Sequence, residues 1–247
     1  MPYLTIAYIN LYGQSGMKVD KILSLSFFIK HYKLDIINCQ EANVDPDTFD
    51  NADFINSNYN IISNNALSKY GTCSLVSSNL SYDKVRVDTD GWAIIFDLPD
   101  LHTTIGNVYL PSGNELTTKQ KREDYSARIL PNLLIDRLPN GIIGDDCNCI
   151  LSKKDYTKDL EVKMSPRVAA LTRMFDMSDD FRKLCPLDLA MPHYYKNNGP
   201  EGTRIHRSYI YGEIKTVTDF YTPIILSFKL PANLKITFSQ IHPTFPN

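Results

Sequence analysis

The sequence predicts an α/β fold in which two β-sheets pack face to face and helices cover their outer surfaces. Apolar runs of strand length alternate along the chain with segments of helical periodicity. Hydrophobic residues make up 43% of the 247 residues, which is enough to fill the core of such a sandwich. Several of the apolar runs also end in polar residues, as expected where strand ends of a layered α/β fold meet at a site.

Strands and helices are expected at intervals along the whole chain. The segments with strand composition or alternation are 4–10, 35–40, 59–63, 72–77, 84–88, 92–97, 103–109, 141–145, 204–211 and 234–238. Helical periodicity marks 18–32, 119–138 and 165–175, and Ser165-Pro166 is a favourable helix start. No linker-like, low-complexity or repeated stretch divides the chain, so we expect residues 1–247 to form a single domain.

The segment IIGDDCNCI, residues 142–150, is the most informative stretch. An apolar strand ends there in Asp146 and Asn148, which point the same way if the chain is extended. A carboxylate can hold a hard cation or orient a nucleophile, and an amide two residues later can bind a phosphate or water beside it. Such pairs also form turns through bonds to the neighbouring backbone, so the pair has this alternative explanation.

Three other predicted strands end in polar residues of suitable types. LTIAYIN ends at Asn10, LDIINCQEA ends in Gln40-Glu41, and TTIGNVYLPSG places Tyr109 before a Pro-Ser-Gly turn. Taken singly, Asn10 could be a turn residue, Glu41 a solvated acid and Tyr109 a rim residue. The ordered series favours a shared site at one edge of the layers.

These motifs, taken in order, resemble those of the endonuclease/exonuclease/phosphatase superfamily, whose members have a DNase I-like four-layer α/β sandwich. The matching segments are IAYINLYGQSG, DIINCQE, YGTCSLV, DTDGWAIIF, NVYLPSGN, GDDCNCI, FRKLCP and TRIHRSY. More narrowly, the chain looks like the apurinic-type endonuclease domain of non-LTR retrotransposons, where the central motif reads roughly GGDWNCI or GGDFNCI. Asp145 then replaces a glycine and Cys147 an aromatic residue, while the functional pair is kept.

The resemblance implies a role for each strand-end residue in metal-dependent cleavage of a phosphodiester. Glu41 would bind the divalent metal, Mg²⁺ or Mn²⁺, with Asn10 beside it. Tyr109 would hydrogen-bond the scissile phosphate, and Asp146 with Asn148 would align the attacking water and support the phosphate. The residues expected to bind substrate are Gln40, Arg204 and His206. This chemistry needs a cation to spread developing charge, a positioned water and donors for the non-bridging oxygens.

The C-terminal third departs from the family pattern. The family's Ser-Arg-Ile-Asp becomes Thr-Arg-Ile-His at 203–206, and the final Ser-Asp-His becomes Ser227-Phe228-Lys229. A rival alignment sets Thr-Asp-Phe at 218–220 against the same motif, and it also lacks the histidine. Loss of a positioned acid–base group typically costs about 10²–10⁴ in rate. Lys229 could supply positive charge in the catalytic site, and His206 is either a substitute imidazole or a surface or structural histidine.

Two functional classes follow from these observations. One is a DNA-nicking endonuclease of the retrotransposon type, impaired by the lost Asp-His pair and acting with a reverse transcriptase. The other is a catalytically inactive relic that keeps the fold and binds nucleic acid. A superfamily member acting on small phosphoesters or phospholipids is a third option that the motifs favour less. The net charge of −2 provides no global attraction for DNA, so binding depends on local groups.

Cysteine spacing and hydropathy bear on the compartment. The five cysteines fit no zinc-binding spacing, so we expect reduced thiols and an intracellular location, with the nucleus as one option. The N-terminus has no secretion signal, and no apolar run is long enough to span a membrane. We expect a monomer whose main partner is DNA.

Overall fold

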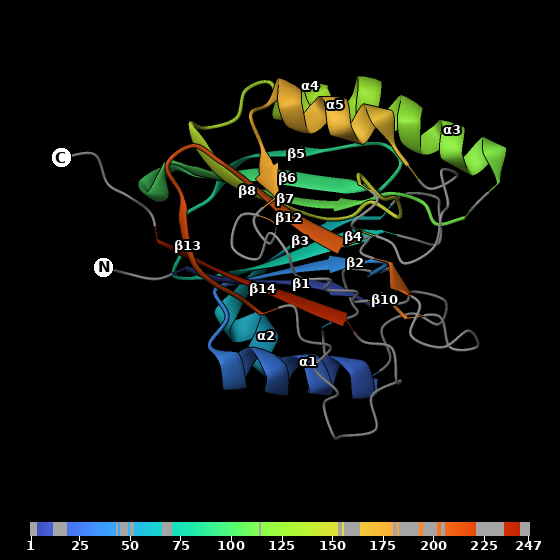
Figure 1. Cartoon of the computed structure of the whole chain (residues 1–247). Coiled ribbons are helices and arrows are strands. Elements are labelled where there is room, and N and C mark those ends of the chain that lie inside the picture. The colour runs from blue at the N-terminus through green and yellow to red at the C-terminus, as the bar shows by residue number, and fades with distance from the viewer. Residues whose placement is uncertain are drawn as a thin grey trace.

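A computed structural model shows two six-stranded β-sheets packed face to face, with helices on both outer surfaces (Figure 1). The structure describes residues 4–11, 19–42, 44, 49, 52–65, 71–113, 115–152, 155, 164–179, 182, 193–194, 202–203, 206–220 and 235–242. The predicted four-layer α/β sandwich is therefore confirmed.

The first sheet has the strand order β13-β14-β1-β2-β4-β3. Its strands are β1 (Leu4–Asn10), β2 (Ile36–Gln40), β3 (Tyr59–Asn64), β4 (Thr72–Ser77), β13 (Lys215–Phe220) and β14 (Lys235–His242). The second sheet has the order β5-β6-β7-β8-β12-β9. Its strands are β5 (Asp83–Val87), β6 (Ala93–Leu98), β7 (Thr103–Tyr109), β8 (Asn140–Asp146), β9 (Ser178–Asp179) and β12 (His206–Tyr211), and a separate ribbon pairs β10 (His193–Tyr194) with β11 (Gly202–Thr203).

Three hydrophobic clusters fill the spaces between the four layers. One packs the outer face of the first sheet against α1 (Val19–Tyr32) and α2 (Asp53–Asn58). A second packs the outer face of the second sheet against α4 (Leu130–Leu134) and α5 (Pro166–Met174), which lie together with α3 (Leu116–Asp124) in Figure 1. The third lies between the two sheets and consists mainly of Ile, Leu and Val side chains. A short 3-10 helix, η2 (Pro99–Leu101), connects β6 to β7.

Most predicted elements are confirmed within one or two residues, and the differences have local causes. The predicted helix 119–138 is divided into α3, a π-helical turn η3 (Tyr125–Ile129) and α4. The Leu130 N–H bonds Tyr125 O five residues back. Pro131, which lacks an N–H, follows in the first turn of α4 and favours such a local change of pitch. Strand β13 and helix α2 were not predicted from the sequence, and both are only six residues long.

Parallel pairing within each sheet brings the predicted polar strand ends together. β1 and β2 are parallel, and Asn10 lies opposite Gln40 at their carboxyl ends. β7 and β8 are parallel as well, with Tyr109 opposite Asp146. Because the two sheets are stacked, both pairs lie at the same edge of the sandwich, where Asn10 reaches Asp146 by a direct hydrogen bond.

The sheets approach each other closely at Gly144 of β8. A Cβ atom at this position would lie 2.0 Å from Cε1 of the Tyr8 ring, which projects from β1. Tyr8 is itself buried in the layer between the sheets. Glycine at position 144 therefore allows the ring to fit directly behind the site-bearing ends of β1 and β8.

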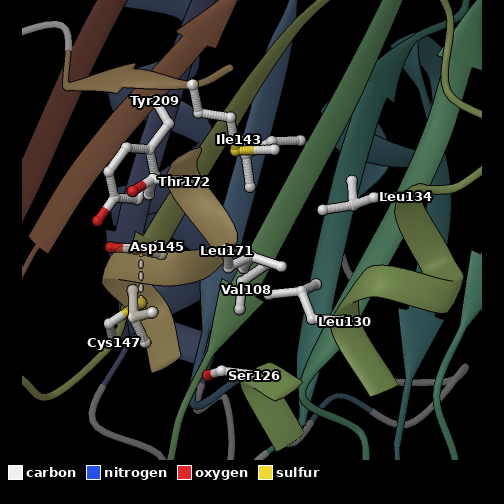
Figure 2. Close-up of a pocket in the computed structure, with 12 residues that line it drawn as sticks. Val108, Ser126, Leu130, Leu134, Ile143, Asp145, Cys147, Leu171, Thr172 and Tyr209 are labelled. Atoms are coloured by element: carbon white, nitrogen blue, oxygen red, sulfur yellow. Dashed lines mark hydrogen bonds between the residues drawn. The ribbon is translucent and has the colours of Figure 1, made fainter. Parts of the chain in front are cut away.

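Asp145 points away from this layer, toward the helices on the outer face of the second sheet (Figure 2). It lines a small cavity together with Cys147, Tyr209, Ser126 of η3 and apolar residues of β7, β8, α4 and α5. The Cys147 thiol donates to Asp145 Oδ2 at 2.5 Å. Burial raises the pKa of Asp145 to about 7, although Arg207 and the Cys147 thiol act in the opposite direction.

We expect Gly144→Ala to destabilise the protein by about 1–3 kcal/mol, because the new methyl group collides with the Tyr8 ring. Urea denaturation measures the loss. Combining Gly144→Ala with Tyr8→Leu should recover part of it, since leucine lacks the ring atoms. Strictly additive losses in the double variant would show that the contact does not limit this position.

We expect the free energy of unfolding to fall as the pH rises from about 4 to about 7. The raised pKa means that folded Asp145 keeps its proton in a pH range where the unfolded side chain has lost it. The stabilisation of the folded state by this protonated carboxyl is therefore complete below the unfolded pKa of 3.8 and is lost as the pH rises through about 7. Asp145→Asn should flatten the profile in this window. Asp100→Asn, at an exposed aspartate, is the control and should leave the slope unchanged.

Candidate active site

The amide of Asn10 joins the two carboxylates that the sequence placed on different strands. Its Nδ2 donates to Glu41 Oε1 at 3.1 Å and to Asp146 Oδ2 at 2.8 Å. Glu41 follows β2 in the first sheet, whereas Asp146 ends β8 in the second. Both carboxylates therefore share one donor across the space between the sheets, close enough to act on the same cation or phosphate.

The backbone of two site residues is left-handed, which non-glycine residues rarely adopt. Glu41 has φ 50° and Asn148 has φ 48°. The Asn148 conformation is supported by its own side chain, which donates from Nδ2 to Leu110 O at 2.7 Å, and by its N–H, which donates to Asp146 Oδ1 at 3.3 Å. Such conformations cost energy and recur at functional sites, where they aim a side chain in a fixed direction.

Tyr109 is buried beside the two carboxylates. Burial is the main cause of the raised pKa of its hydroxyl, and the charges of Glu41 and Asp146 add to it, while hydrogen bonds with Ser112 act in the opposite direction. The hydroxyl consequently keeps its proton throughout the physiological range. It is suited to donate a hydrogen bond to an anionic oxygen and unsuited to act as a base.

The side chain of Gln40 is buried between the sheets and is not open to a substrate. Its side chain is 1% exposed, and Nε2 donates to Asn107 Oδ1 of β7 at 2.9 Å. It lies behind Glu41, between the sheets. The sequence predicted Gln40 as a binding residue, and the structure shows its amide nitrogen in a buried contact with Asn107.

A buried ionic cluster holds the loop that follows Asp146, and the sequence analysis did not find it. Arg207 of β12 donates from Nη1 to Cys149 O at 3.0 Å and from Nη2 to Asp155 Oδ2 at 3.2 Å. Arg182 binds the other oxygen of Asp155 at 3.0 Å. Asp155 also accepts from the N–H of Ser152 at 3.1 Å.

Three of the predicted site residues, Arg204, His206 and Lys229, belong to the C-terminal part of the chain. His206 begins β12, and its backbone is directly opposite Asp146. Arg204 and Lys229 lie outside the described residues. The last strand, β14, begins at Lys235 opposite Asn10, so the segment carrying Lys229 precedes a strand that enters the sheet beside the site. Asp219 of the rival alignment instead lies inside β13, opposite Ser239.

The donors at this edge suit a hard divalent cation. Glu41 and Asp146 supply carboxylate oxygens, and Mg²⁺ is commonly held by one or two carboxylates, with waters and substrate phosphates completing its shell. Among the described residues, no group of three or more His, Cys, Asp and Glu side chains could hold a metal ion. The four cysteines among the described residues, Cys39, Cys73, Cys147 and Cys149, are free thiols. No described helix is long and apolar enough to cross a bilayer.

No protein-family model matches the sequence, and no curated protein matches it. Solved structures do. An AP endonuclease from Archaeoglobus fulgidus superimposes with a TM-score of 0.77 at 16% identity, covering 96% of this chain and 98% of that one. The AP endonuclease LMAP from Leishmania major gives 0.75 at 13% identity, covering 98% and 88%.

A third structure, the 3′ phosphatase NExo from Neisseria bound to a product DNA hairpin, gives a TM-score of 0.70 at 14% identity, covering 96% of this chain and 98% of that one. These identities are low, so the likeness establishes the fold and leaves the chemistry to the site itself. The chain adopts the DNase I-like α/β sandwich fold that these AP endonuclease and phosphatase structures share.

Proposed function

We propose that the protein is a metal-dependent phosphodiesterase that nicks DNA. The observation that carries the proposal is the Asn10 amide shared between Glu41 and Asp146, with the Tyr109 hydroxyl beside them. This arrangement combines two acidic oxygen ligands and a protonated phenol at the edge where strands of both sheets end. The structural neighbours include proteins described as AP endonucleases and a 3′ phosphatase bound to a product DNA hairpin, which supports DNA as the substrate.

Each side chain has a role that fits its environment. Glu41 holds the cation, Mg²⁺ or Mn²⁺, and Asn10 fixes the direction of its carboxylate. When bound, the cation neutralises charge developing on the phosphate. Asp146 orients the attacking water, and the Asn148 amide, set by its bond to Leu110 O, supports the phosphate. The Tyr109 hydroxyl donates to a non-bridging oxygen.

Substrate contacts outside this centre are proposed for Arg204 and His206, because β12 begins opposite Asp146 and these residues lie at or just before its start. Lys229 is proposed to add positive charge from the segment that leads into β14. The net charge of −2 makes such local cations the main source of attraction for the DNA backbone.

The finer proposal is an endonuclease of the non-LTR retrotransposon type, formed by residues 1–247 as a single domain. The order of the motifs and the sequence GDDCNCI support it. Such an enzyme acts in the cell, in or near the nucleus, together with a reverse transcriptase. The competing function is DNA binding without cleavage, which the replacement of Asp-His by Phe228-Lys229 favours.

Glu41→Ala should lower Mg²⁺-dependent nicking of supercoiled plasmid by at least about 100-fold, because it removes the proposed cation ligand. Glu213→Ala is a matched control, since Glu213 is exposed and lies beyond the opposite end of β12. Full nicking by Glu41→Ala would refute the assignment of the site. Binding of DNA without nicking by the folded wild-type protein would identify the inactive alternative.

Phe228→Asp combined with Lys229→His should raise the nicking rate by about 10²-fold or more, because it restores a positioned acid–imidazole pair. Phe228→Asp alone is the control and should give little gain without the imidazole. A well-folded double variant with unchanged nicking would show that residues 227–229 do not occupy the position of the family's final motif.

A further inference from the structure

We propose that the buried amide pair of Asn107 and Gln40 positions Glu41 relative to Tyr109 and Asp146, and so sets the spacing of the cation site. Asn107 belongs to β7 of the second sheet, whereas Gln40 ends β2 of the first. The inference rests on the proposed function in one respect, namely that Glu41 is the cation ligand. Asn107 acts through Glu41 and is a positioning residue.

Asn107 makes four hydrogen bonds with the opposite sheet, and all are buried. Its Oδ1 accepts from Gln40 Nε2 at 2.9 Å. Its Nδ2 donates to Cys39 O and to Cys73 O, each at 3.1 Å, and to Ser74 Oγ at 3.5 Å. Cys39 and Cys73 face each other across β2 and β4. One side chain therefore fixes two neighbouring strands of the first sheet at the level of the residue before Gln40.

The segment that these contacts hold leads directly into Glu41. The Gln40 carbonyl accepts from Leu11 N at 2.9 Å, and Ala42 N donates to Gly71 O at 2.8 Å, so the backbone is held on both sides of Glu41. Between these anchors Glu41 has φ 50°, which turns the chain sharply. With the backbone fixed in this way, the direction of the Glu41 side chain toward Asn10 depends on where Gln40 is held.

Asn107 also sets the position of Tyr109. Asn107 and Tyr109 are two residues apart on β7, so their side chains leave the strand on the same face. Tyr109 is opposite Asp146 in the register of β7 and β8. A change at Asn107 thus alters the distance between Glu41, which the first sheet carries, and Tyr109 and Asp146, which the second sheet carries.

A polar pair at this place is not required for packing alone. Apolar side chains such as Ile94, Phe96 and Ile105 fill the neighbouring space between the sheets, and an apolar residue at position 107 would pack there without hydrogen bonds. A buried amide is tolerated only when its groups are bonded, and its directional bonds admit few alternative alignments of the sheets. Groups that hydrogen-bond a metal ligand directly typically contribute about 10- to 100-fold to metal affinity, and we expect a pair that positions the backbone of the ligand to contribute at the lower end of this range.

The first test measures Mn²⁺ binding by electron paramagnetic resonance without DNA. Gln40→Met keeps the side-chain volume and the backbone contacts but removes the side-chain hydrogen bond to Asn107, and Asn107→Leu removes all four hydrogen bonds to the first sheet. Each should raise the Kd for Mn²⁺ at least about 10-fold. Thr104→Val is the matched control, because Thr104 is also fully buried on β7 and its hydroxyl bonds Asp97 and Leu138, away from the site. It should leave the Kd unchanged.

The second test needs no metal and uses the side-chain amide of Asn10, which donates to both carboxylates. Its ¹H–¹⁵N NMR signals should shift in Gln40→Met and Asn107→Leu and stay in place in Thr104→Val. If Asn107→Leu fails to fold, Gln40→Met still decides. Unchanged signals and Kd in the folded variants, or equal changes in Thr104→Val, overturn the positioning role. Shifted signals in a protein that binds no Mn²⁺ would uphold the positioning role and refute the proposed cation site.

Discussion

The shared hydrogen-bond donor at Asn10 is the interaction on which the site depends. Neither sheet alone carries a complete set of groups, because Glu41 belongs to the first and Asp146 and Tyr109 to the second. Two carboxylates in a partly buried place repel each other unless a donor or a cation lies between them. The Asn10 amide supplies that donor, at 3.1 Å and 2.8 Å, and holds the two acids next to each other.

Close contact between the sheets makes this interaction possible. Gly144 admits the Tyr8 ring, and the Asn107–Gln40 bond ties β7 to β2 just behind the site. On the other side of β8, Asp145 is covered by helices and kept from water, which separates its chemistry from that of its neighbour Asp146. Two adjacent acids thus have different environments because alternate residues of a strand face opposite layers.

The loop after β8 shows how structure outside the site supports it. Arg207 bonds Cys149 O, Asp155 bonds the N–H of Ser152, and the two side chains bond each other. The left-handed Asn148 therefore lies between strand β8 and a backbone segment that these bonds hold. Removing either partner from such a buried ion pair is costly, because the remaining charge keeps no adequate partner. The cluster therefore holds the backbone that directly follows Asn148.

Local patterns along the chain were sufficient to predict the layered fold, most strand positions and the identity of the strand-end residues, because alternation and strand-end polarity are local properties. Asn10, Glu41, Tyr109 and Asp146 could be named for this reason, although their roles remain proposals. Which of these groups contact one another follows from the packing of the two sheets. The Asn10 bridge, the Asn107–Gln40 pair and the Arg207–Asp155 contact join residues 31 to 136 positions apart. Such contacts depend on sheet register and stacking, which no local pattern encodes. The short strand β13 was not predicted, since it forms by pairing with β14. The π-helical turn was not predicted either, since it depends on the nearby Pro131.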